Sequence, residues 1–130
     1  MALVKEHAIE SIHSMHELIE KIFSGKHSEQ DLPSLIDYFS DRFEMVGAAG
    51  KRISLQEVKT LFSNNQGKMP EIQIEIYDEQ ILLQNEHSIV LTYTEKHTKA
   101  SGILIRRSCG LIEEIDGKMQ WSYLQETFLA

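Results

Sequence analysis

Apolar side chains recur at helical spacing over the first part of the chain. Between residues 3 and 23 they fall on one stripe of a helical wheel, while the opposite side carries glutamates and His13. The spacing predicts a long amphipathic helix over this range, and Gly25 is a stop signal just beyond its end. The stripe consists of Val4, Ala8, Ile12, Met15, Ile19 and Ile22.

Two shorter helices are expected further along, separated by a hairpin. The first covers residues 31–39 and is capped by Asp31. Residues 42–54 have the pattern of a short strand, a glycine-bounded turn and a second short strand. The second helix begins at a capping box, in which Ser54 accepts from an early backbone N–H and Glu57 reaches back to the N–H of Ser54.

After Pro70 the pattern changes from helical to alternating, which indicates strands. We expect them over residues 72–78, 80–84, 89–97, 103–113 and 119–129. The last three are long and consecutive, so an antiparallel meander is their simplest topology. Helices first and sheet last make a single α+β domain over residues 1–130. If the first helix lies across a strongly curved, mostly antiparallel sheet, the two can enclose a cone-shaped cavity.

The last predicted strand has two mixed faces. Trp121, Tyr123, Gln125 and Thr127 alternate with Ser122, Leu124, Glu126 and Phe128. We prefer the interpretation in which Trp121, Tyr123 and Gln125 look into the cavity, because it gathers the larger aromatic side chains. If the other face of the strand looks inward instead, Glu126 is the cavity carboxylate and pairs with an inward arginine. A small change of strand register would exchange the two faces.

Composition limits the partners and the compartment. The chain has 13 basic and 20 acidic residues, and its net charge of -7 repels a phosphate backbone. Arg106 and Arg107 point to opposite faces of a strand, so we expect no nucleic-acid partner. No apolar run approaches the roughly 18 residues that cross a membrane. The charged start differs from a signal peptide, which favours a reduced cytoplasmic compartment, and the lone Cys109 has no internal disulfide partner.

The most polar cavity candidate is the strand over residues 89–97. One of its faces passes from apolar residues to Tyr93, Glu95 and His97. If this face lines the cavity, Glu95 would be a buried base of raised pKa, Tyr93 a donor to a developing oxyanion and His97 a residue at the mouth. The alternative is that Tyr93 packs in the core while Glu95 and His97 approach solvent.

At least one of the two arginines is expected to point inward, and Arg107 is our candidate for ligand binding. A buried arginine needs a carboxylate partner, since an unpaired buried charge costs several kcal/mol. Glu95 and Glu126 are the available carboxylates on neighbouring strands. The arginine either recognises an acidic ligand or forms a salt bridge that fixes the strand register, and we favour the salt bridge.

The first helix carries a group of histidines and glutamates that could suggest a metal site. His13 and Glu17 lie nearly opposite the apolar stripe, in solvent, and His16 lies at its edge. No further ligand is expected to converge there, so we predict neither a metal nor a cofactor.

The order of elements resembles the nuclear transport factor 2-like superfamily, and within it the SnoaL-like group of small bacterial proteins. The segments that carry the resemblance are LPSLIDYFSDRFEMVGAAGKRIS, VLTYTEKH, RRSCGLI and WSYLQETFL. Together with the first helix they cover nearly the whole chain. The resemblance implies a cystatin-like α+β roll whose helices and curved sheet enclose a cone-shaped cavity.

Function is less determined, because this superfamily includes isomerases, cyclases, dehydratases, assembly modules and transport adaptors. Our first hypothesis is a binding protein that holds a small apolar ligand with one or two polar groups in the cavity, and an acidic ligand is the variant that an inward arginine would recognise. The second is an enzyme that transfers protons with Glu95 and Tyr93, although the Asp base and the Tyr/Asp pair of the steroid isomerases have no counterpart here. The third is an assembly module without a ligand. The expected ligand-binding residues are Tyr38, Phe43, Met45, Tyr93, Glu95, His97, Arg107, Trp121, Tyr123 and Gln125.

The resemblance also implies a homodimer. We expect it to form through the outer face of the sheet, which would otherwise expose Val90, Leu104 and Ile112.

Overall fold

The computed structural model describes residues 5–129 and contains three helices in the first half of the chain. They are α1 (Lys5–Ser24), α2 (Asp31–Ile36) and α3 (Leu55–Asn64). The first predicted helix is confirmed over its described part, while Leu3 and Val4 lie outside the described residues. Helix α2 ends at Ile36, earlier than predicted, because Phe39 already pairs with Trp121 in the sheet.

Within residues 5–129 the strands form one six-stranded sheet in the order β2-β1-β6-β5-β4-β3. They are β1 (Phe39–Val46), β2 (Arg52–Ser54), β3 (Gln73–Gln84), β4 (Ser88–Lys99), β5 (Gly102–Ile115) and β6 (Lys118–Phe128). The predicted antiparallel meander is confirmed, whereas the parallel pairing of β1 with β6 was not foreseen. The two strands expected over residues 72–84 are one strand, because Asp78, with a φ of 60°, carries the chain through an irregularity without ending the pairing with β4.

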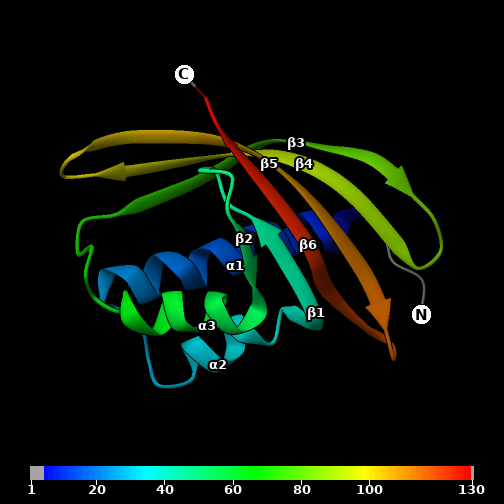
Figure 1. The fold of residues 1–130 in the computed structure, drawn as a ribbon, viewed down its shortest axis with the longest axis horizontal. Coiled ribbons are helices and arrows are strands. Elements are labelled where there is room, and N and C mark those ends of the chain that lie inside the picture. Colours follow the sequence, from blue (N-terminus) through cyan, green and yellow to red (C-terminus); the bar gives the residue numbers. More distant parts are fainter. Residues whose placement is uncertain (1–4, 130) are drawn as a thin grey trace.

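The sheet bends over the three helices, which gives the predicted α+β architecture (Figure 1). Helix α1 packs against β3, where the Glu20 carboxylate accepts a hydrogen bond of 2.7 Å from the backbone N–H of Ile74. The core between the helices and the sheet includes Ala8, Ile12, Ile22, Ile89, Leu91 and Ile112, none of which has any exposed surface. Within residues 5–129, no helix combines the length and the apolar character that crossing a bilayer requires.

Helix α3 begins at the predicted capping box. The Ser54 hydroxyl accepts from the backbone N–H of Glu57 at 3.2 Å, and the Glu57 carboxylate accepts from the N–H of Ser54 at 3.3 Å. Val58 and Phe62 form its buried face. Because α3 also contacts β1 and β2, it covers the part of the sheet that α1 leaves open.

Trp121 is part of the core and packs closely against the neighbouring strand β5. It is fully buried, and its indole Nε1–H donates to the Ser11 hydroxyl at 3.3 Å. The ring lies against Gly110 of β5 so closely that a Cβ at this position would stand 2.3 Å from Cζ3 of the indole. Glycine is therefore required at position 110 for Trp121 to stay where it is.

A bulge after Trp121 reverses the two faces of β6. Trp121 pairs with Ile112 and Tyr123 with Leu111, so Ser122 is an extra residue between two regular stretches. Trp121 points into the core before the bulge, and Leu124 and Glu126 do so after it, whereas Gln125 is exposed. Our preferred prediction, which placed Tyr123 and Gln125 inward with Trp121, is wrong because it assumed unbroken alternation.

The convex face of the sheet also differs from the prediction. Leu104 and Ile112 were expected on it. Every second residue of β5 from 104 to 112 instead pairs with an inward-facing residue of β4 and so faces inward itself, and Ile112 is fully buried. Val90 does lie on the convex face. It stands in a row across four strands that consists of Leu83, Val90, Leu111 and Tyr123.

Candidate functional site

A cavity of about 370 Å³ opens between α1, α3 and the concave face of the sheet. Much of its wall is apolar and includes Met15, Ile19, Phe43, Met45, Phe62 and Leu124. Five charged or titratable side chains from four elements also reach it, and we call them the polar cluster. The polar cluster consists of His16 from α1, Glu95 and His97 from β4, Arg106 from β5 and Glu126 from β6.

Glu95 is the central member of the polar cluster. Its Oε1 accepts from His16 Nε2 at 3.1 Å, and its Oε2 accepts from His97 Nε2. Burial alone would raise the pKa of Glu95, but the positive charge of His16 and the hydrogen bonds from both histidines hold that pKa well below its ordinary value. The raised pKa that we predicted for Glu95 is therefore wrong, and this carboxylate stays ionised near neutral pH.

His16 supplies the charge that Glu95 needs. Its Nδ1 lies 2.7 Å from the carbonyl oxygen of Ile12, while its Nε2 faces Glu95, and the side chain is almost fully buried. Since both neighbours are hydrogen-bond acceptors, both ring nitrogens carry a proton and the ring is an imidazolium. Burial lowers the pKa of His16, but the charge of Glu95 and the hydrogen bond to it outweigh burial, so the pKa is raised.

Glu126 and Arg106 form the second charged pair of the cluster. Arg106 Nη1 donates to Glu126 Oε1 at 3.2 Å, and the Phe128 ring lies 5.5 Å from the guanidinium carbon. Burial and the nearby negative charge of Glu95 raise the pKa of Glu126 to about 7, although Arg106 favours the ionised form. Glu126 therefore exchanges its proton close to neutral pH, as a general acid or base must.

Tyr93 lies behind the cavity wall. Its side chain is fully buried, and its ring packs edge-on against His16 and Trp121, with centroid distances of 5.6 Å and 6.3 Å. Burial, together with the charges of Glu95 and Glu126, raises the pKa of Tyr93 well above its ordinary value. Tyr93 is therefore a neutral phenol of the core, and it is absent from the cavity lining among the described residues.

The remaining predicted ligand-binding residues divide into two groups. Phe43, Met45 and His97 line the cavity together with Glu95. The others lie elsewhere, since Trp121 is buried in the core and Tyr38 lines a separate depression near Met119.

Three predicted residues lie on the convex face, which corrects their expected position at the cavity. Arg107 is half-exposed and lies 3.6 Å from the carboxylate of Asp78, while the Tyr123 hydroxyl donates to the Gln125 side chain at 3.1 Å. Arg106, one residue earlier, points inward instead. The salt bridge between Arg106 and Glu126 corresponds to the structural role that we favoured for an inward arginine.

His16, Arg106 and Glu126 are the members of the polar cluster that the preferred sequence interpretation missed. His16 lies at the edge of the apolar stripe of α1, and only the packing of α1 on the sheet reveals that Glu95 approaches it. The available signal was the position of His16 at the edge of the stripe, because a polar side chain beside a buried face needs a hydrogen-bond partner.

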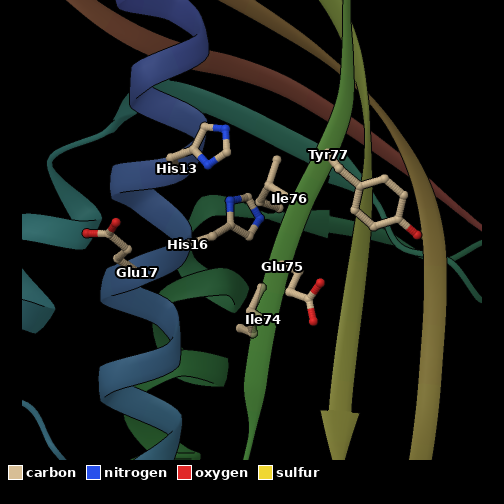
Figure 2. Close-up of a pocket in the computed structure, with 7 residues that line it drawn as sticks. All are labelled: His13, His16, Glu17, Ile74, Glu75, Ile76 and Tyr77. Carbon is tan, nitrogen blue, oxygen red and sulfur yellow. The ribbon is translucent and has the colours of Figure 1, made fainter.

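An open groove of about 400 Å³ lies on the other side of His16, between α1 and β3. In Figure 2, His16 projects from α1 toward β3, Glu17 points away from β3, and Tyr77 projects from the far side of the strand. His13 lies 3.4 Å from Glu79 and is half-exposed. No group of three or more His, Cys, Asp or Glu residues within the described part of the chain is arranged to hold a metal ion.

Comparison with solved structures places the fold among known ones. An NTF2-like protein of unknown function from Pseudomonas aeruginosa superimposes with a TM-score of 0.91 and 29% sequence identity, over 95% of this chain and 98% of that one. The association domain of C. elegans CaMKII matches with a TM-score of 0.69 and 11% identity, over 95% and 96% of the two chains. A cystatin-like protein of unknown function from Nostoc punctiforme gives a TM-score of 0.69 and 12% identity, over 99% and 96%.

These similarities show an NTF2-like, cystatin-like α+β fold and support the nuclear transport factor 2-like superfamily. No family model and no curated protein matches the sequence.

Proposed function

We propose that the protein binds a small, mostly apolar molecule with one polar group inside its cavity. The observation that carries this proposal is an open space of about 370 Å³ whose apolar walls surround the polar cluster. Binding pockets for small molecules have this composition, because apolar walls supply most of the affinity and a few polar groups fix the orientation. The proposed function agrees with the resemblance to the SnoaL-like group, which also stays a prediction.

The walls and the polar cluster have separate tasks in this proposal. Phe43 and Phe62, from β1 and α3, flank the apolar part, where a ring or an alkyl chain would replace water. Arg106 and Glu126 lie at the polar part and would contact the polar group of the ligand. His16 and His97 act indirectly, because their hydrogen bonds hold Glu95 in place.

A neutral fluorescent probe tests this proposal. Prodan has a naphthalene ring and a carbonyl group, and its emission shifts to the blue when it leaves water. We expect wild-type protein to bind prodan with a blue shift. Ile53→Trp should weaken binding at least about tenfold, because the partly buried Ile53 lines the cavity and the larger ring would take up part of its volume.

Ile103→Trp is the matched control for this substitution, because it makes the same change of side chain at another isoleucine. Ile103 is 60% exposed and does not line the cavity, so the added ring should leave prodan affinity unchanged. Circular dichroism and thermal unfolding verify that both variants are folded. Failure of prodan to bind, or equal affinity in wild type and Ile53→Trp, would contradict a ligand-binding cavity.

Proton transfer is a second candidate function, and the pKa of Glu126 favours it. A carboxyl group whose pKa is raised to about 7 beside a guanidinium suits an isomerase, cyclase or dehydratase. In this version Glu126 takes the role that we first gave to Glu95, and Arg106 replaces Tyr93 as the donor to a developing oxyanion. Glu126→Gln would remove turnover of any substrate that is found, and a variant with full turnover would contradict the mechanism.

Self-association is compatible with both functions. One matching structure is the association domain of C. elegans CaMKII, and another is described as a putative association domain of the same kinase type from Exiguobacterium sibiricum. We infer a homodimer through the convex face, where the row formed by Leu83, Val90, Leu111 and Tyr123 would be covered.

A further inference from the structure

The charges of the polar cluster do not balance at neutral pH. His16 and Glu95 form an ion pair at 3.1 Å and neutralise each other. The remaining pair is Arg106 with Glu126, and the raised pKa of Glu126, about 7, means that this carboxyl is neutral for part of the time. The guanidinium of Arg106 stays charged. The cavity therefore contains an excess of positive charge, to which Lys51 at its edge adds.

Arg106 also has hydrogen-bond donors to spare. A guanidinium has five N–H groups, and in Arg106 one of them, on Nη1, donates to Glu126. The Nε–H is buried without a hydrogen-bond partner among the described residues. The Phe128 ring lies over the group, with its centroid 5.5 Å from the guanidinium carbon. An acceptor is therefore missing beside a charged, partly buried donor, and such a site is costly to leave unfilled.

We propose that the polar cluster binds a carboxylate group of the ligand, held by Arg106 and by Glu126 in its protonated form. This inference rests on the proposed function, and it specifies the ligand as a small aromatic or aliphatic carboxylic acid. The carboxylate would accept one hydrogen bond from the guanidinium of Arg106 and one from the O–H of Glu126. Both hydrogen bonds are charge-assisted and therefore strong. An ammonium group would be repelled by the positive charges of Arg106, His16 and Lys51. An alcohol would leave the excess positive charge without a counter-charge.

Binding of an anion is linked to the proton on Glu126. A second negative charge in the cavity favours the protonated carboxyl, so the complex takes up a proton when Glu126 is ionised beforehand. The affinity for a carboxylate should therefore decrease as the pH rises above about 7. The other charged and titratable groups that line the cavity with Glu126 are His16 on α1, Lys51 before β2, Glu95 and His97 on β4, and Arg106 on β5.

Three naphthalene probes that differ in one substituent test the inference. Naphthoate carries a carboxylate, naphthalenemethanol an alcohol and naphthylmethylamine an ammonium group. Isothermal titration calorimetry near pH 6 should give naphthoate an affinity at least about tenfold higher than that of the other two. Near pH 8.5 the advantage of naphthoate should fall about tenfold or more, while the alcohol keeps its affinity.

Substitutions separate the two proposed contacts. Glu126→Gln keeps a neutral donor at all pH values, so it should retain naphthoate binding and abolish its pH dependence. The double variant Arg106→Gln with Glu126→Gln removes the pair without leaving an unpaired charge. It should lose at least about tenfold in naphthoate affinity and still bind naphthalenemethanol, which also shows that it is folded. Arg107→Gln removes the same charge from the convex side of β5 and should change neither affinity.

The outcomes distinguish this inference from the proposed function. If naphthalenemethanol or naphthylmethylamine binds as tightly as naphthoate, the carboxylate inference fails and the ligand-binding cavity stands. An equal loss of naphthoate affinity in Arg107→Gln and in the double variant would overturn it as well, because the effect would be general electrostatics. If none of the three probes binds, both the inference and the proposed function are contradicted.

Discussion

Substitution of Glu126 by glutamine should stabilise the protein in alkaline solution. The pKa of Glu126 is raised from 4.5 to about 7 by burial and by the charge of Glu95. Unfolded Glu126 loses its proton near pH 4.5, whereas the folded protein retains it up to about pH 7, so the folded form binds more protons in this window. A group of this kind makes the free energy of unfolding decrease as the pH rises through the window.

The magnitude follows from the size of the shift. The difference of about 2.5 pKa units corresponds to about 3 kcal/mol, at about 1.4 kcal/mol for each unit. Glu126 is nearly buried, at 9% exposure, so solvent screens this penalty little. Glutamine imitates the protonated side chain at every pH. The free energy of unfolding of Glu126→Gln minus that of wild type should therefore increase by about 3 kcal/mol between about pH 4.5 and about pH 8.5.

Urea denaturation of both proteins at the two pH values measures this difference. Glu71→Gln is the control, because Glu71 is exposed and its substitution should change stability little at either pH. A pH-independent difference between Glu126→Gln and wild type would refute the reasoning, since it would mean that Glu126 titrates alike in the folded and unfolded chains.

Three further predictions concern the core, the ion pair and the convex face. Gly110→Ala should lower the free energy of unfolding by about 1–3 kcal/mol in urea denaturation, because the new Cβ would stand 2.3 Å from the Trp121 ring, and an unchanged value would contradict this packing. His16→Ala should cost about 3 kcal/mol or more, because it removes the imidazolium that pairs with the buried charge of Glu95 and leaves only the hydrogen bond from His97, and a cost below about 1 kcal/mol would show that the His16–Glu95 pair is not ionised. Light scattering at micromolar concentration should give the mass of a dimer for wild type and a shift toward monomer for Leu111→Lys, whereas a wild-type monomer would rule the dimer out.

Much of the fold could be predicted from periodicity alone. The stripe on α1, the Ser54 capping box and the alternation of the last strands are local signals, and each gave the expected type of element. The parallel pairing of β1 with β6 could not be predicted, because it joins segments far apart in the sequence that carry no mark of their pairing.

The candidate site was predicted less well, for a specific physical reason. One extra residue at Ser122 exchanges the two faces of β6, which moves Gln125 out of the interior and Glu126 into it. Nothing in the alternation of residues 119–129 reveals the bulge. The bulge directly follows Trp121, which packs over Gly110 of β5 in a contact between two strands that the alternation does not reveal. Likewise, the environment of Glu95 depends on His16, which comes from α1.

The central claim is that the cavity beside the polar cluster binds a small molecule. A crystal structure of the protein with bound prodan tests it most directly. We predict that the naphthalene ring lies between Phe43 and Phe62 and that the carbonyl oxygen accepts a hydrogen bond from Arg106 or Glu126. A cavity without the probe, closed by its own side chains, or a probe bound only on the convex face, would contradict the claim.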